Sequence, residues 1–153
     1  DGLMHFYDSD NCAIEEEGSA KFLNYSQWPS ELPSPYLVKA SDTLLDKFSD
    51  SLIHGITATA PGFYGPQGRT MRYRLAYPQL NNILSEFSYK NLQITNYEME
   101  TSALYGLSRL LNHNAVTICI AIANRASGEY NANYKQHLNR LIEFALSQIV
   151  NKF

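Results

Sequence analysis

Three short polar segments of the chain carry the side chains that could bind a ligand or take part in a reaction. They are the loop 60–69, the stretch 96–100 and the run 122–127. They offer aromatic rings, three amides, two carboxylates and two guanidinium groups. The sequence contains no metal-ligand spacing, no Gly-rich phosphate loop and no nucleophile elbow, which leaves a metalloenzyme, a nucleotide kinase and a serine hydrolase without support.

The loop 60–69 holds three glycines and two prolines, which specify its conformation. Phe63 could stack on a flat ring, the Gln67 amide could meet a carbonyl and an N–H together, and Arg69 could donate to another carbonyl. The acceptor, donor, acceptor edge of a pyrimidine suits this set of groups. An ordinary Gly/Pro surface loop whose aromatic rings cover the core explains the same residues, and composition alone favours that second interpretation.

The stretch 96–100 places two carboxylates where a strand is expected to end and a helix to begin. In extended backbone Glu98 and Glu100 would point to the same side, about 7 Å apart, with Met99 opposite. A carboxylate there could accept hydrogen bonds from two sugar hydroxyls and favour a cation-like ribose transition state. Acidic residues also simply suit the positive end of a following helix, which needs no ligand.

The run 122–127 is the point where an apolar segment gives way to polar residues. A guanidinium at the carboxyl end of a strand, as Arg125 would be, is well placed to reach a ligand in the crevice there. The same position would suit a partner in a surface salt bridge, and position alone does not separate the two.

Predicted strands separated by predicted helices indicate an α/β layered fold. Residues 1–34 are expected to form a strand end and long surface loops, with the acidic run 15–17 as a solvated face. Cys119 is expected to be a small buried thiol within an apolar strand. We expect helices over 35–48, 77–87, 101–111 and from Tyr134 to Ile149, strands over 51–59, 92–97 and 116–123, and a loop over 60–69.

Composition limits the possible partners. The 153 residues include 12 Lys and Arg against 15 Asp and Glu, a formal charge of -3, and no basic run. This length suits one domain, and the charge gives no footprint for nucleic acid or a membrane surface. No segment is long and apolar enough to span a bilayer. Two cysteines form no disulfide framework, so a reducing, cytoplasmic setting is expected.

Four stretches together resemble the first family of nucleoside phosphorylases, and within it the uridine-cleaving members most closely. They are GITATAPGFYGPQGR (55–69), NYEMETSALYG (96–106), IAIANRAS (120–127) and, as the family's central strand region, DGLMHF (1–6). The resemblance implies an α/β fold with a layered mixed β-sheet flanked by helices. It implies that residues 1–153 are the C-terminal portion of a single such domain, whose N-terminal half is lacking.

The resemblance also implies roles for individual residues. Glu100 and Arg125 would be catalytic, the former holding the ribose and the latter stabilising the departing base. In purine-specific relatives an aspartate usually lies near the position of Asn124, so its absence points to a pyrimidine. The base would contact Phe63, Gln67, Arg69, Tyr97, Ile122, Ala123 and Arg125, and the ribose would contact Glu98, Met99 and Glu100.

The implied reaction is phosphorolysis of uridine to uracil and ribose 1-phosphate, as part of cytoplasmic pyrimidine salvage. It needs no metal or cofactor, and inorganic phosphate is the co-substrate. The phosphate site is expected upstream of Asp1, so little activity is expected of the chain without that N-terminal half. A homo-oligomer, dimer or hexamer, is implied as well. The alternatives are a purine nucleoside phosphorylase or nucleosidase of the same fold and an inactive nucleoside-binding fragment.

Overall fold

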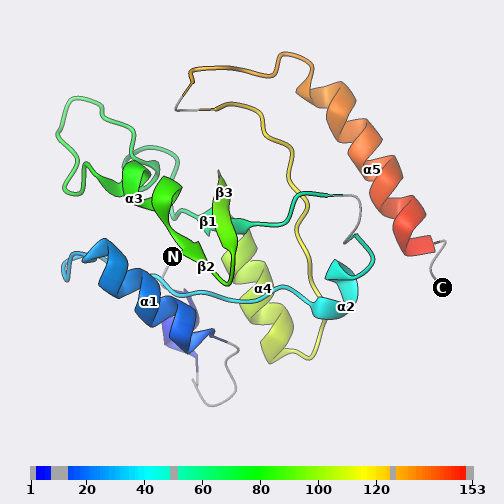
Figure 1. Cartoon of the computed structure of the whole chain (residues 1–153), viewed down its shortest axis with the longest axis horizontal. Helices are drawn as coiled ribbons and strands as arrows, with labels where there is room; N and C mark the ends of the chain where they lie inside the picture. The colour runs from blue at the N-terminus through cyan, green and yellow to red at the C-terminus, as the bar shows by residue number, and fades with distance from the viewer. Residues whose placement is uncertain (1–2, 8–13, 49–51, 125–126, 151–153) are drawn as a thin grey trace.

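The computed structural model describes residues 3–7, 14–48, 52–124 and 127–150. A three-stranded mixed sheet lies at its centre, in the order β1-β3-β2 (Figure 1). Strand β1 (Ile56–Thr59) pairs in parallel with β3 (Leu92–Glu98), and β2 (Ser88–Tyr89) pairs antiparallel to the start of β3. β3 is therefore the central strand, and the loops that follow β1 and β3 leave the sheet at the same edge.

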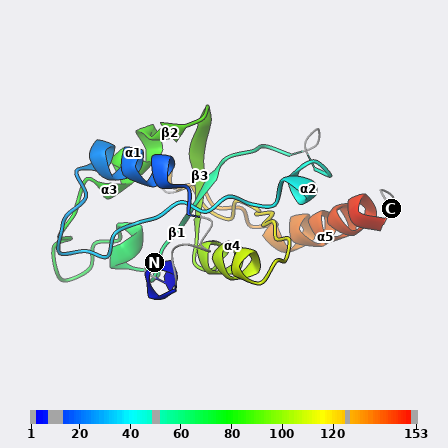
Figure 2. The same ribbon diagram turned by 90° about the horizontal axis from the view of Figure 1, so that it is seen from below.

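Helices flank this sheet on both sides. α1 (Glu16–Ser26) and α3 (Leu80–Glu86) lie on one side, and α4 (Thr101–Leu110) lies on the other (Figure 2). The prediction of a layered mixed sheet flanked by helices is confirmed.

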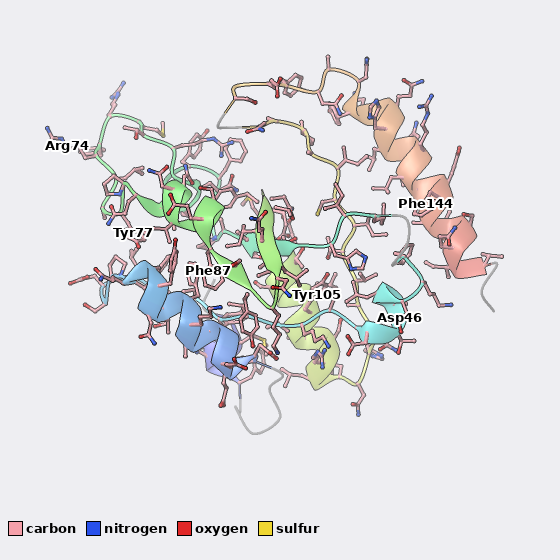
Figure 3. All side chains as sticks on the ribbon, viewed as in Figure 1. Asp46, Arg74, Tyr77, Phe87, Tyr105 and Phe144 are labelled. Atoms are coloured by element: carbon pink, nitrogen blue, oxygen red, sulfur yellow. The ribbon has the colours of Figure 1, made fainter. Side chains whose placement is uncertain are left out.

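Aromatic side chains fill the space between α1, α3 and the sheet. Phe87 is 2% exposed, and its ring meets the Phe22 ring edge to face with the centroids 5.0 Å apart. Such pairs stabilise a core beyond the area they bury. Tyr77 and Phe87 are labelled in Figure 3, and the complete buried cluster is Phe22, Tyr77, Leu80, Leu84, Phe87 and Tyr89.

The expectation of only a strand end and loops over 1–34 is wrong, because α1 occupies Glu16–Ser26. The buried face of α1 consists largely of small residues rather than an apolar stripe. Gly18, Phe22 and Ser26 follow one another at helical spacing on that face. A side chain at Gly18 would lie 2.9 Å from the Tyr89 ring, so close packing and not hydrophobic periodicity defines this helix.

The acidic run is also more than a solvated face. Glu15 forms an ion pair with Lys90, and the Tyr89 hydroxyl donates to Glu15 at 2.9 Å and to Glu17 at 3.2 Å. Hydrogen bonds from Lys90 and Tyr89 hold the pKa of Glu15 below its ordinary value. These contacts attach the start of α1 to the β2–β3 turn.

The prediction of a helix over 35–48 is wrong for most of its length, since α2 covers only Asp42–Leu45. The residues before it are extended because their backbone groups are bound elsewhere. The Leu37 N–H donates to Ser19 Oγ at 2.9 Å, and its carbonyl accepts from the Glu15 N–H at 2.8 Å. The N–H and carbonyl groups of Leu37 are already bonded in this way, so they do not form the hydrogen bonds of a helix.

The first residues contain a short 3-10 helix, η1 (Leu3–Phe6), where the family resemblance implied a strand. Met4 is 1% exposed and packs against α4. A Cβ at Gly106 would lie 2.1 Å from Met4 Sδ, so the glycine allows this close approach.

Apart from the strand over 116–123, the remaining predicted elements are present with adjusted ends. The strand over 51–59 is shortened to β1, while the helices over 77–87 and 101–111 and the strand over 92–97 are α3, α4 and β3. The C-terminal helix is α5 (Tyr134–Val150), and the Phe144 ring on it lies 6.2 Å from the Phe48 ring. Within the described residues, no helix has both the length and the apolar character needed to cross a membrane.

The prediction of a strand over 116–123 is wrong. The segment is extended, but its described pairing is a single bridge between Ala123 and Tyr130. The Thr117 N–H instead donates to the Tyr105 hydroxyl at 2.8 Å, a side-chain bond that replaces a ladder bond. Cys119, on this segment, is exposed rather than buried.

Replacement of Phe87 by alanine should lower the free energy of unfolding by about 3–5 kcal/mol, because it removes a ring from the centre of the aromatic cluster. Urea denaturation followed by circular dichroism measures the change. Phe6→Ala is the matched control, since that ring is 87% exposed, and it should change stability by no more than about 0.5 kcal/mol. Equal losses for the two variants would contradict the described core.

Candidate functional site

The carboxyl ends of β1 and β3 bring two of the three polar segments together. Thr59, the last residue of β1, pairs with Glu98, the last residue of β3. The Ala60 N–H donates to the Glu98 carbonyl at 2.9 Å, so the loop 60–69 starts attached to β3. The carboxyl edge of parallel strands is where α/β proteins place their ligand crevices.

A tight turn folds the loop back on itself. The 3-10 helix η3 (Gly65–Gln67) carries a proline in its first turn, and Gly68 follows it with φ +71°. The N–H groups of Gln67 and Arg69 both donate to the Tyr64 carbonyl, at 3.1 and 3.0 Å. Glycine suits a left-handed conformation, so the glycine and proline content of the loop specifies this turn.

The turn is seated on α3. A Cβ at Gly68 would lie 2.4 Å from the Asn81 amide nitrogen, which leaves room for glycine alone at this contact. Asn81 Oδ1 also accepts a hydrogen bond of 2.8 Å from the hydroxyl of Tyr97, one of the predicted base-binding residues. Asn81 therefore links Tyr97 on β3 to the loop.

Phe63, Gln67 and Arg69 lie in direct contact within the loop. The Arg69 guanidinium lies over the Phe63 ring, 3.6 Å from its centroid. Arg69 Nη1 donates to Gln67 Oε1 at 3.0 Å and to the Phe63 carbonyl. Gln67 is 4% exposed, whereas Phe63 is 52% exposed. The three groups thus form one amide, guanidinium and ring cluster, in which Arg69 covers one face of the ring.

The Glu98 carboxylate faces the start of α4. Its Oε2 accepts the N–H groups of Glu100 at 2.7 Å and Thr101 at 2.6 Å, and its Oε1 accepts the Thr59 hydroxyl. Partial burial raises the pKa of Glu98, but the hydrogen bonds from Thr59, Glu100 and Thr101 outweigh burial and hold the pKa below its ordinary value. This carboxylate satisfies orphan N–H groups at the helix start.

Met99 and Glu100 lie in the bend between β3 and α4. Glu100 is exposed and is the N-cap residue of α4, with φ -131° and ψ -24°. Met99 is 39% exposed. The strand ends at Glu98, so the extended backbone on which the expected same-side pair of carboxylates depends does not continue to Glu100.

The third polar segment, which begins at Ile122, follows the extended residues 116–121. The Ile122 carbonyl accepts the Asn131 N–H at 2.7 Å, and Ala123 forms a bridge with Tyr130. Ile122 is 44% exposed. Arg125, a predicted catalytic and base-binding residue, lies outside the described residues.

A largely apolar cavity of about 950 Å³ adjoins the carboxyl ends of the strands. Of the predicted base-binding residues, Tyr97 lines it. The extended run also borders this cavity through Val116, Cys119 and Ala121. Ala60 and Pro66 of the loop line this cavity, whereas Phe63, Gln67 and Arg69 are not among its lining residues.

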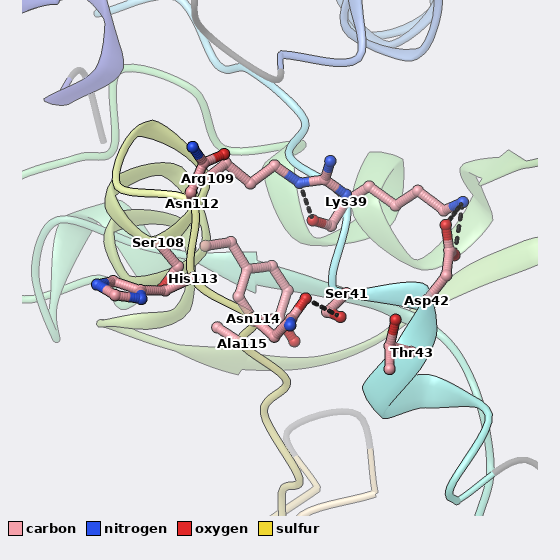
Figure 4. A pocket seen from close by; sticks show the side chains of 11 residues that line it. Lys39, Ser41, Asp42, Thr43, Ser108, Arg109, Asn112, His113, Asn114 and Ala115 are labelled. Atoms are coloured by element: carbon pink, nitrogen blue, oxygen red, sulfur yellow. Dashed lines mark hydrogen bonds and ion pairs between the residues drawn. The ribbon is translucent and has the colours of Figure 1, made fainter.

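A second, polar cavity of about 400 Å³ lies at the end of α4 (Figure 4). Its charged groups bind neighbouring parts of the chain. Lys39 pairs with Asp42 at 2.7 Å, and Arg109 donates to the carbonyls of Lys39 and Ala40 at 3.0 and 3.1 Å. Together with the bond of 2.7 Å from Ser41 Oγ to Asn114, these contacts attach the residues around α2 to α4.

Hydrogen bonds around Glu98 form a junction between the ends of β1 and β3 and the start of α4. Thr59 and Thr101 complete this junction, and neither residue was predicted from the sequence. Thr59 Oγ1 accepts the Ser102 N–H at 3.0 Å in addition to its bond to Glu98. The signal available was a hydroxyl at the last position of a strand directly before a Pro-Gly loop. Among the described residues, no three His, Cys, Asp or Glu side chains gather as metal ligands would.

Comparisons with known proteins agree on one family. The family model described as the phosphorylase superfamily matches residues 5–151. A uridine phosphorylase of Thermococcus kodakarensis is 33% identical over 127 residues, covering 77% of this chain and 42% of the relative. The chain therefore spans less than half the length of that curated relative. No solved structure matches the chain significantly.

The titration of Glu98 tests the described junction. We expect its carboxyl to titrate below the ordinary value of 4.5, because the charged form accepts three hydrogen bonds. Since the folded pKa is lowered, its contribution to stability is present above the unfolded pKa and disappears as pH falls through the folded pKa. Carbon-13 NMR of the Glu98 carboxyl measures both states, with the urea-unfolded chain as control. A folded-state pKa equal to or above the unfolded one would contradict the described bonds.

Proposed function

Because the chain belongs to the phosphorylase superfamily, we propose that it binds uridine and supplies the base and ribose contacts of a uridine phosphorylase. The similarity to a uridine phosphorylase supports the choice of a pyrimidine nucleoside. The observation that carries the proposal is the contact cluster of Phe63, Gln67 and Arg69, on a loop attached to the strand that leads into Glu100.

Uracil suits this cluster chemically. The Gln67 amide offers both an acceptor and donors, and the Arg69 guanidinium offers five N–H donors in a planar fork. A base carbonyl would take one edge of the guanidinium, while the amide would meet the neighbouring N–H and carbonyl. Phe63 and Tyr97 would provide apolar contacts to the ring, with Ile122, Ala123 and Met99 completing the pocket.

The proposed reaction breaks the glycosidic C–N bond, and the bonding electron pair leaves with the base. Uracil departs with negative charge spread over its carbonyl oxygens, which donors from Gln67, Arg69 and Arg125 would stabilise. The ribose becomes oxocarbenium-like, and the Glu100 carboxylate would hold its hydroxyls. Inorganic phosphate then forms the new bond at the anomeric carbon, which yields ribose 1-phosphate.

Phosphate is the co-substrate in this proposal, and no metal or cofactor takes part. The phosphate contacts would come from polypeptide outside these 153 residues, consistent with a relative more than twice as long as the matched part. We also propose a homo-oligomer, a dimer or hexamer, and a role in cytoplasmic pyrimidine salvage.

Ligand titrations test the base preference. Saturation-transfer NMR and calorimetry with the purified chain should detect uridine and uracil but not adenosine. Tighter binding of adenosine than of uridine would favour a purine nucleoside phosphorylase or nucleosidase of the same family. Release of ribose 1-phosphate in the presence of phosphate and of the N-terminal half that the proposal requires would distinguish an enzyme from a nucleoside-binding fragment.

Arg69→Ala should weaken the binding of both uracil and uridine by about 10–100-fold, the effect of losing hydrogen bonds from a charged group. Calorimetry measures both dissociation constants. Arg74→Ala is the matched control, because Arg74 is an exposed guanidinium on the segment between the loop and α3. Unchanged affinity in Arg69→Ala, or an equal loss in Arg74→Ala, would exclude Arg69 from the base site.

Glu100→Gln should weaken the binding of uridine by about tenfold while the affinity for uracil stays unchanged, because the side chain is proposed to contact only the sugar. The ratio of the uridine and uracil dissociation constants is the measurement. Glu86→Gln, an exposed carboxylate at the end of α3, serves as the control and should leave that ratio alone. An equal effect on both ligands would remove Glu100 from the ribose site.

A further inference from the structure

The Thr59 hydroxyl connects three parts of the proposed site. It donates to Glu98 Oε1 and accepts the Ser102 N–H at 3.0 Å. Thr59 is the last residue of β1, Glu98 is the last residue of β3, and Ser102 lies in the first turn of α4. The hydroxyl group at the end of β1 is thus bonded both to the end of β3 and to the first turn of α4.

The two oxygens of Glu98 divide their partners between the strand and the helix. Oε1 accepts from Thr59, and Oε2 accepts from the backbone N–H groups of Glu100 and Thr101. A carboxylate with all these partners would have to give up bonds at a helix start in order to accept from a sugar hydroxyl. Glu100 has its N–H held in this way while its side chain remains exposed.

The same junction fixes where the base loop starts. The Ala60 N–H donates to the Glu98 carbonyl at 2.9 Å, and the loop with Gln67 and Arg69 follows. Glu98 is therefore bonded on one side to the start of the loop and on the other to the backbone of Glu100. The distance between the base contacts and the sugar contact depends on this one residue and on the Thr59 hydroxyl that orients it.

We propose that Thr59 and Glu98 are positioning residues that hold Glu100 at a fixed place relative to the base loop and thereby set the preference for a nucleoside over the free base. This inference rests on the proposed function, and it assigns Glu98 to positioning rather than to contact with the ribose. A hydroxyl is required at position 59 because it must donate and accept at once. Serine can do so, whereas valine, with nearly the same shape, can do neither.

The test compares Thr59→Val, Thr59→Ser and Thr57→Val by calorimetry with uridine and with uracil. Thr57 is a closely matched control, because its hydroxyl also donates across from β1 to β3, at 3.0 Å to Asn96, but it lies two residues before the junction. Thr59→Val should weaken the binding of uridine by about tenfold and the binding of uracil by less than about twofold, since only the sugar contact moves. Thr59→Ser should keep the ratio of the uridine and uracil dissociation constants that the unaltered chain has. Thr57→Val should not change that ratio either.

A second measurement does not depend on ligand binding. Amide hydrogen exchange of Glu100 and Thr101 should become faster in Thr59→Val and in Glu98→Gln, but not in Thr57→Val. If Thr59→Val proves too unstable for titration, hydrogen exchange in Glu98→Gln still tests the positioning role, because this substitution keeps the size of the side chain.

The results separate two kinds of failure. Equal loss of uridine and uracil in Thr59→Val, failure of serine to restore the ratio, or the same change in Thr57→Val would overturn the positioning role while the proposed function stood. If the unaltered chain bound neither ligand, the proposed function would fail and the inference with it. Exchange rates would still report whether the junction itself exists.

Discussion

The parallel pairing of β1 with β3 is the interaction on which the proposed site depends. Segments that begin 39 residues apart, at Ala60 and at Met99, leave the sheet at the same edge because Thr59 and Glu98 are partners in the ladder. An antiparallel pairing would have placed the two segments at opposite ends. The aromatic core beneath α1 and α3 supports this pairing, since Ile56, Ala58 and Ile94 pack against it.

A half-buried carboxylate at this edge would be costly if its charge were not compensated. Among the described residues, Glu98 is compensated by hydrogen-bond donors rather than by a cation: the Thr59 hydroxyl and two N–H groups at the positive end of α4. The neutral donors hold the carboxylate in one orientation without bringing a second charge into the crevice. The guanidinium of Arg69 is bound within the loop, to Gln67 and to the Phe63 ring.

Local pattern predicted the parts of the fold that depend on local order. Apolar spacing identified α4 and α5, and the composition of the loop 60–69 singled out Phe63, Gln67 and Arg69, which lie within seven residues of one another. Where contacts distant in sequence decide, the same approach failed: the buried face of α1 is made largely of small residues, and within the described residues the run 116–123 is paired only by the bridge between Ala123 and Tyr130. The importance of Thr59 could not be predicted either, because it comes from a partner 39 residues away.

The contacts inside the loop limit how a base could enter. The Arg69 guanidinium lies 3.6 Å from the centroid of the Phe63 ring, so that face of the ring is already occupied. A base stacking there would displace a cation–π contact worth about 0.5–1 kcal/mol at an exposed site. A base approaching edge-on would keep this contact and could take the place of the bond from Arg69 to Gln67. Since an arginine already held against a ring loses little further freedom on binding, edge-on approach costs less conformational entropy. The geometry therefore favours Phe63 as the support of Arg69, and in the proposed site hydrogen bonding rather than stacking on that face would select the base.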